Sequence, residues 1–400
     1  MMYSIRKRTK TDGANMRVFP SSLINDDFLQ LYWQKKPLLM RQALLPPADL
    51  VTKSGLLTLA CGGEDVESRL ILEHGETPWE AHHGPFERTD LEHLPDSHWT
   101  LLIQDMNRHM PEIRPLLDAF SAIPQWRLDD IMISYAADRG SVGPHTDDYD
   151  VFLIQASGKR RWKIHQHPVG DEDLIPDLDL KILKTFDTEM EWLLEPGDIL
   201  YLPPNVAHWG VAEGECITWS VGFQGPALTE LSIHWLEERL STLPPQRYTD
   251  PDLKTQQHSG EISPQAIAHI RELLLQALSF SNEELTAWFG RFSSEPKENL
   301  IPPRLENSIT EAALLQQLQQ GIQVRRHPFS KILFSRLPDS LLLFASGESF
   351  TLPEDSLDLA ILLSEEHQYR HQQLQPWLQS PQCLTLLTKL VNRGDLLIIS

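Results

Sequence analysis

The feature of this 400-residue sequence that most restricts its fold is a series of short β-strand patterns between residues 123 and 223. Turn signals separate these patterns, among them Ser157-Gly158 and Pro196-Gly197-Asp198. Short strands at this spacing, with Gly and Pro in the turns, are typical of a β-sandwich or a β-barrel. The expected strands cover residues 131–136, 151–155, 159–164, 198–202 and 216–223.

Helical patterns lie on both sides of this β-rich segment, so the chain is expected to be an α+β protein. Before it, we expect helices at 26–33, 48–61 and 111–120 and a strand at 98–104. After it, one-sided apolar patterns predict helices at 228–240, 263–278 and 281–289, with a loop at 243–259. Ser263 and Ser281 are the expected N-caps of the last two helices. The apolar stripes suit a dimer interface and an intradomain core equally well.

The last hundred residues form a separate pattern of helices with a small hairpin, which suggests a winged-helix-like domain. We expect helices at 310–320, 358–363 and 383–391, paired strands at 331–334 and 340–345, and a closing strand at 396–399. Many winged helices bind DNA, but residues 301–400 contain 8 Lys and Arg against 10 Asp and Glu. Because the basic footprint of a nucleic-acid-binding domain is missing, we expect an interaction or structural domain with no direct DNA binding.

The net charge and the cysteine spacing indicate which partners and which cellular compartment to expect. The formal net charge of -21 repels nucleic acid and favours basic partners, although simple solubility explains it equally well. The three cysteines are far apart and form no CxxC pair, which fits a reducing cytoplasm. No run reaches the ~20 apolar residues of a membrane helix. Residues 1–17 are basic without a following apolar stretch, which predicts a flexible tail and not a secretory signal.

The residues that carry the chemistry are His145, Asp147 and His208. On an extended backbone, His145 and Asp147 at positions i and i+2 project to the same face. His208 follows a Pro-Gly-Asp strand and the turn Pro203-Pro204-Asn205. Two imidazoles and one carboxylate occupy one face of a metal and leave the other open, as in the facial triad of non-haem Fe(II) oxygenases. The alternative is a loop histidine at 145 and a buried, hydrogen-bonded one at 208.

A candidate anion site lies on the expected strand at 159–164. There Arg160, Trp162 and Ile164 share one face, and Arg161 and Lys163 share the other. An arginine that faces the interior of a β-barrel is costly unless it meets an anion, and its fork suits a dicarboxylate co-substrate. Ser134, on an earlier strand, could add a hydroxyl group. The alternative is that Arg160 is one more surface cation.

The block from Asp129 to Phe223 resembles a JmjC-type oxygenase of the cupin superfamily, with a double-stranded β-helix (jelly-roll) fold. The runs at 132–135, 142–147, 149–152 and 220–223 are similar to those of the bacterial ribosomal oxygenases. The resemblance implies Fe(II) as cofactor, 2-oxoglutarate and O2 as co-substrates, and release of succinate and CO2. It implies hydroxylation of an arginine β-carbon in a basic ribosomal protein of the large (50S) subunit.

The same resemblance implies a domain order and a set of site residues. It implies an oxygenase domain at 18–226, a helical dimerisation region at 227–300 that makes a homodimer, and a winged-helix-like domain at 301–400. It carries His145, Asp147 and His208 over as iron ligands and Arg160 as the 2-oxoglutarate anchor. The candidate residues for the substrate arginine are Asp129, Asp130, Tyr149 and Ser220.

Two other functions are compatible with parts of this pattern. A JmjC N-methyl-lysine demethylase shares the iron and the co-substrate and differs in what lies over the metal. No Cys/His cluster of the sequence provides the zinc-binding reader module that such demethylases often carry. A non-enzymatic cupin-like scaffold is the other alternative, but a scaffold has no need for His145, Asp147, His208 and Arg160 together.

Overall fold

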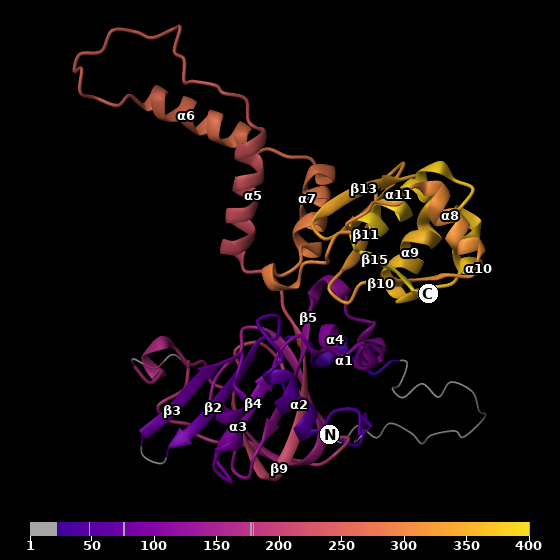
Figure 1. The fold of residues 1–400 in the computed structure, drawn as a ribbon. Helices are drawn as coiled ribbons and strands as arrows, with labels where there is room; N and C mark the ends of the chain where they lie inside the picture. The colour runs from indigo at the N-terminus through magenta and orange to yellow at the C-terminus, as the bar shows by residue number, and fades with distance from the viewer. Residues whose placement is uncertain (1–21, 48, 75–76, 177, 179, 400) are drawn as a thin grey trace. The chain divides into compact units, whose positions relative to one another are not determined.

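The computed structural model describes residues 22–47, 49–74, 77–176, 178 and 180–399 (Figure 1). The expected flexible tail at 1–17 lies outside these residues. The chain divides into two compact units, Met1–Gly225 and Pro226–Ser400, which are treated separately below.

An antiparallel nine-stranded sheet forms the first unit, as the short strand patterns predicted. Its strands follow the order β1-β8-β6-β9-β5-β4-β2-β3, and β7 pairs with β6 beside this path. The strands are β1 Leu38–Met40, β2 Ser68–His74, β3 Thr77–His83, β4 Trp99–Ile103, β5 Leu128–Ala136, β6 Asp150–His165, β7 Met190–Leu194, β8 Ile199–Leu202 and β9 Ala207–Phe223.

The two long strands β6 and β9 organise this unit. They pair antiparallel along almost their whole length, from Asp150 opposite Phe223 to His165 opposite Ala207. On its other side, β6 pairs with β8 in its first half and with β7 in its second half. β6 therefore joins two different neighbouring strands to β9.

The turn predicted at Ser157-Gly158 is wrong, because β6 continues through it as one strand with irregular pairing. Gly158 has φ +63, and a Cβ there would lie 2.1 Å from the carbonyl oxygen of Glu215. Only glycine fits this backbone and this close approach. The residues that predicted a turn therefore form a β-bulge, which bends the strand without ending it.

Short helices pack around the sheet and differ in part from the predictions. α1 (Asp26–Leu31) is capped by Asn25, and α2 covers only Lys53–Ala60 because Thr52 accepts a hydrogen bond from Gly55 N–H and starts the helix there. The segment predicted as an α-helix at 111–120 is the 3₁₀-helix η1 (Pro111–Phe120), with a second proline inside it. The remaining helices are α3 Arg88–Glu92, α4 Met106–His109, η2 Gln125–Arg127 and η3 Asp171–Asp173.

Aromatic side chains from distant segments fill the core of this unit. The Phe152 ring on β6 lies 4.9 Å from Tyr201 on β8 and 4.8 Å from Phe120 of η1, and all three side chains are buried. Phe28 of α1 packs against the same group.

The second unit begins with three helices. Two predicted N-caps are confirmed, because Ser263 accepts a hydrogen bond from Ala266 N–H and Ser281 accepts one from Glu284 N–H. The helices are α5 Leu228–Thr242, α6 Pro264–Ala277 and α7 Asn282–Ser294. An ion pair joins Arg291 of α7 to Glu238 of α5. No residue of α5 or α6 is buried, although both helices carry apolar stripes.

Two three-stranded antiparallel sheets and several helices complete the second unit. The sequence predicted one hairpin and a closing strand, and it missed β10, β13 and β14. One sheet has the order β11-β12-β13 and the other β14-β10-β15. The elements are η4 Glu298–Leu300, α8 Glu311–Gln319, β10 Gln323–Arg326, β11 Ile332–Arg336, β12 Leu341–Ala345, β13 Glu348–Leu352, η5 Glu354–Ser356, α9 Leu357–Glu365, β14 Gln368–Tyr369, α10 His371–Leu374, η6 Gln375–Trp377, α11 Pro381–Asn392 and β15 Leu396–Ile399.

Across the described residues, no helix is both long enough and apolar enough to cross a membrane.

Candidate metal centre

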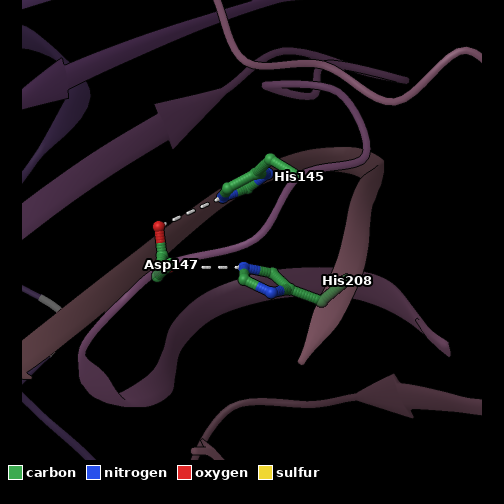
Figure 2. A group of neighbouring side chains, drawn as sticks. All are labelled: His145, Asp147 and His208. Atoms are coloured by element: carbon green, nitrogen blue, oxygen red, sulfur yellow. Dashed lines mark ion pairs between the residues drawn. The ribbon is translucent and has the colours of Figure 1, made fainter. Parts of the chain in front are cut away.

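The structure brings His145, Asp147 and His208 together, as the sequence predicted (Figure 2). One ligand atom from each residue lies within 4.8 Å of the other two. Nε2 of His145 is 3.8 Å from one carboxylate oxygen of Asp147, and Nε2 of His208 is 3.6 Å from the other. In the part of the chain that the structure describes, this is the only His, Cys, Asp and Glu group of this kind.

Backbone hydrogen bonds position the three side chains. The N–H groups of His145 and His208 donate to each other's carbonyl oxygens, which forms an antiparallel bridge outside the named strands. Asn205 N–H donates to the carbonyl oxygen of Asp147 at 2.7 Å. These bonds link the loop after β5 to the start of β9, so residues 63 positions apart share one site.

Both imidazoles are oriented in the same way. Nδ1 of His145 lies 2.9 Å from the carbonyl oxygen of Gly143, and Nδ1 of His208 lies 2.9 Å from that of Val206. Since a carbonyl oxygen only accepts, each Nδ1 carries the hydrogen and each Nε2 keeps its lone pair. The two lone pairs and the Asp147 carboxylate form a donor set that fits one divalent transition metal.

The electrostatics of the site also favour a metal ligand at His208. Burial, and secondly the neighbouring His145, lower the pKa of His208 from 6.5 to about 4. His208 is 2% exposed and therefore neutral at physiological pH, the form that binds a metal. His145 and Asp147 are about one-fifth exposed, which leaves one side of the site accessible.

The side chain of Arg160 is buried, as its place on one face of the strand with Trp162 and Ile164 predicted. It is 3% exposed, and burial lowers its pKa. Its guanidinium donates to the Ser134 hydroxyl at 3.4 Å and to the Gly210 carbonyl oxygen at 3.3 Å, while its Nε–H has no acceptor in the described part of the chain. A buried cation with neutral acceptors only, and with one N–H left over, has the properties of a site that takes an anion.

Two of the predicted substrate residues, Asp129 and Asp130, interact electrostatically with a third, Tyr149. Burial first, and then the carboxylates of Asp147, Asp130 and Asp129, raise the pKa of Tyr149, so its phenol stays protonated. A Cβ at Gly222 would lie 3.7 Å from an oxygen of Asp130 and 3.7 Å from the Tyr149 ring. The missing side chain at 222 therefore leaves space between them. Ser220 is buried on β9 two residues before Gly222, so both project to the same face.

The sequence did not predict how Asp130 is fixed. Asp130 is 6% exposed, and its carboxylate accepts a hydrogen bond from the N–H of Asp105 at 2.8 Å. With the Gln104 amide oriented to satisfy both of its ends, its nitrogen donates to the same carboxylate at 2.9 Å, and its oxygen accepts from Arg69. Asp105 has φ 53, an uncommon backbone conformation for a residue other than glycine. These partners lie about 25 residues before Asp130, and no local pattern signals such a contact.

Comparisons with known proteins agree with this geometry. Residues 115–231 match the JmjC domain family, and residues 272–396 match the ROXA-like winged helix family. The ribosomal protein uL16 3-hydroxylase of Escherichia coli is 34% identical over 378 residues, which cover 92% of this chain and 96% of that protein. The X-ray structure of E. coli YcfD superposes with a TM-score of 0.84 at 31% identity, over 95% of this chain and 100% of that chain.

Two further matches bear on the chemistry. A structure of E. coli YcfD in complex with cobalt and 2-oxoglutarate has a TM-score of 0.80 at 31% identity, and covers 94% of this chain and 98% of that one. A lysine-specific demethylase and histidyl-hydroxylase, NO66 of Brugia malayi, is 35% identical over 83 residues, which are 19% of this chain and 11% of that protein.

The fold and the site define a JmjC cupin domain with a helical region and a C-terminal ROXA-like winged helix, as expected. The chain belongs to the JmjC-domain ribosomal oxygenases.

Proposed function

We propose that this oxygenase uses Fe(II), 2-oxoglutarate and O2 to hydroxylate the β-carbon of an arginine in a basic 50S ribosomal protein, with release of succinate and CO2. The observation that carries the proposal is the buried Arg160, which has no carboxylate acceptor among the described residues, in the same domain as a His-Asp-His donor set. The name of the 34% identical relative, a ribosomal protein 3-hydroxylase, supports the choice of substrate. Such a substrate would be modified in the cytoplasm, where ribosomes are made.

In this proposal His145, Asp147 and His208 hold the iron, and Arg160 with Ser134 holds the distal carboxylate of 2-oxoglutarate. When bound, the metal and the co-substrate supply the activation of O2 and the removal of a hydrogen from carbon. The protein's part is to orient and to exclude water. The Nδ1–H bonds to Gly143 and Val206 keep both Nε2 lone pairs directed at the metal. The neutral state of His208 means that no proton has to leave it first.

The substrate arginine would lie among the acidic and polar groups around Tyr149. Asp130 or Asp129 would bind the guanidinium by paired hydrogen bonds, and the Tyr149 and Ser220 hydroxyls would complete the pocket. The gap above Gly222 provides space beside the Asp130 carboxylate. The formal net charge of -21 would help to attract a basic ribosomal protein.

We also propose the domain limits 18–226, 227–300 and 301–400 and a homodimer through the helical region. The division of the chain at Gly225 supports the first limit. The apolar side chains of α5 and α6 support the dimer, since Leu228 is 79% exposed and Leu275 is 64% exposed in the single chain. Exposed apolar surface on this scale marks an interaction site.

A lysine demethylase is the second candidate, favoured by the local similarity to NO66. A demethylase and a hydroxylase share the metal and the co-substrate, so they differ only in the product. A non-enzymatic scaffold would turn over no 2-oxoglutarate.

The test is mass spectrometry of large-subunit ribosomal-protein peptides after incubation with the enzyme, Fe(II), 2-oxoglutarate and O2. A His208→Ala variant is the control. We expect one added oxygen on an arginine, which the control lacks. Loss of methyl groups from lysine would instead favour the demethylase. Turnover of 2-oxoglutarate without any modified peptide would refute the ribosomal substrate, and no turnover would refute the catalytic function.

A further inference from the structure

Trp162 lies between the candidate anion anchor and a candidate metal ligand. The guanidinium carbon of Arg160 is 5.0 Å from the centre of the indole, and the His208 ring is 5.7 Å from it at an angle of 46°. Trp162 is 3% exposed. One buried side chain therefore contacts both parts of the proposed site.

Gly210 makes this arrangement possible. It lies directly opposite Trp162 in the pairing of β6 with β9, and Ile164 lies opposite His208 in the same register. A Cβ at Gly210 would lie 2.7 Å from Nε of Arg160 and 2.7 Å from two ring carbons of Trp162. Contacts this short are impossible, so any larger residue at 210 must displace the indole, the guanidinium or both. Residue 210 must therefore be glycine so that the buried side chains of Arg160 and Trp162 have enough space.

Trp162 is held by its ring contacts and not by a hydrogen bond. Its Nε1–H is buried with no acceptor among the described residues, although a buried tryptophan N–H usually finds one. The Arg160 Nε–H beside it also has no acceptor. The position of Arg160 thus depends on packing against Trp162 as well as on its two long hydrogen bonds, at 3.4 and 3.3 Å.

We propose that Trp162 is a positioning residue that sets the separation between Arg160 and the metal ligand His208, and thereby selects the chain length of the 2-oxo dicarboxylate co-substrate. This inference rests on the proposed function. A 2-oxo dicarboxylate would bind the metal with its 2-oxo acid end and the Arg160 cation with its distal carboxylate. Its length must therefore match the separation of the two groups. A rigid indole fixes that separation, so acids one carbon shorter or longer than 2-oxoglutarate bind less well.

The test is isothermal titration calorimetry on the full-length protein with Co(II) in place of Fe(II). We would measure Kd for 2-oxoglutarate (five carbons), oxaloacetate (four) and 2-oxoadipate (six). The variants are Trp162→Leu, which removes the ring, Trp162→Phe, which keeps a ring, and Gly210→Ala, which displaces the indole, the guanidinium or both. Trp99→Phe is the control for loss of an indole from the core, because Trp99 is 4% exposed and contacts Tyr135 instead.

We expect Trp162→Leu and Gly210→Ala to weaken 2-oxoglutarate binding at least tenfold and to reduce its preference over the two other acids. Trp162→Phe should keep most of the preference, and Trp99→Phe should keep all of it. Wild-type preference in both Trp162→Leu and Gly210→Ala would overturn the inference; the second variant retains the indole and covers failure of the first to fold. If the wild-type protein with Co(II) binds none of the acids, the proposed function itself fails.

Discussion

The backbones of His145 and His208 are joined directly: His145 N–H donates to His208 O at 3.0 Å, and His208 N–H donates to His145 O at 2.9 Å. Two proposed metal ligands are thus held by peptide groups, which are independent of their side chains. The positions of the imidazoles are built into the fold before any metal binds. Because the backbone hydrogen bonds do not need the imidazoles, each histidine can be substituted without loss of the bridge between the two backbones.

The first prediction is that His145→Ala or His208→Ala removes metal binding with little effect on the fold. The bridge between the two backbones survives both substitutions. We expect Kd for Co(II) to rise by more than about 100-fold, since loss of supporting contacts alone costs 10- to 100-fold. Calorimetry on the metal-free protein measures this change, and circular dichroism checks the fold. His82→Ala, at an exposed position on β3, is the control. Unchanged Co(II) affinity in both variants would refute the ligand assignment.

The second prediction concerns Arg160→Met. The substitution removes a buried guanidinium that has only neutral acceptors among the described residues, so the metal-free protein should become more stable, by about 1–3 kcal/mol. Binding of 2-oxoglutarate to the Co(II) protein should be lost at the same time. Urea unfolding and calorimetry measure the two effects. Arg161→Met is the matched control, because Arg161 forms exposed ion pairs with Glu191 and Glu213 that contribute only about 0–1 kcal/mol. A destabilised Arg160→Met variant that still binds 2-oxoglutarate would contradict the anchor role.

The third prediction is that Gln104→Leu impairs substrate binding and leaves metal binding intact. The substitution removes an amide that donates to the Asp130 carboxylate, so the proposed binding group for the substrate guanidinium loses part of its orientation. We expect KM for the peptide substrate to rise about tenfold, the equivalent of one charge-assisted hydrogen bond. Kinetics with the peptide and Co(II) calorimetry separate the two effects. Gln125→Leu, at an exposed position, is the control. A change in kcat alone would argue against this role.

The fourth prediction concerns the helical region. Leu240→Glu or Leu274→Glu places a charge in the apolar surface of α5 or α6, where these leucines are 66% and 58% exposed in the single chain. Sedimentation velocity should show a dimer for the wild type and a monomer for each variant, with unchanged helix content. Glu237→Gln, at an exposed polar position on α5, should remain dimeric. A monomeric wild-type protein would disprove the dimer.

The fifth prediction is a loss of stability of the metal-free protein at acid pH. The folded-state pKa of His208, about 4, is lower than its unfolded value near 6.5, so the unfolded chain takes up the proton first. The contribution of neutral His208 to the free energy of unfolding is complete above pH 6.5. It declines as the pH falls toward 4, by up to about 3 kcal/mol. Urea unfolding across this range should show a weaker dependence for His208→Gln. Identical pH profiles would contradict the prediction.

Local patterns in the sequence were sufficient for many of the helices and strands and for the metal-binding residues. The spacing of His145 and Asp147, the alternation that turns Arg160 and Trp162 to one side, and the serine caps at 263 and 281 all depend on near neighbours. Period-two strands and helix caps follow from backbone geometry within a few residues. For this reason the metal site and the inward-facing arginine could be predicted without a structure.

The tertiary structure decided everything that depends on register between distant strands. Whether Ser157-Gly158 ends a strand or bends it depends on the close approach of Glu215, 57 residues later. Asp130 on β5 is fixed by the N–H of Asp105, which follows β4 in the chain. Gly210 lies opposite Trp162 because of the register between β9 and the second half of β6. Pairing of this kind follows from burial and packing of the whole sheet, which no short stretch of sequence encodes.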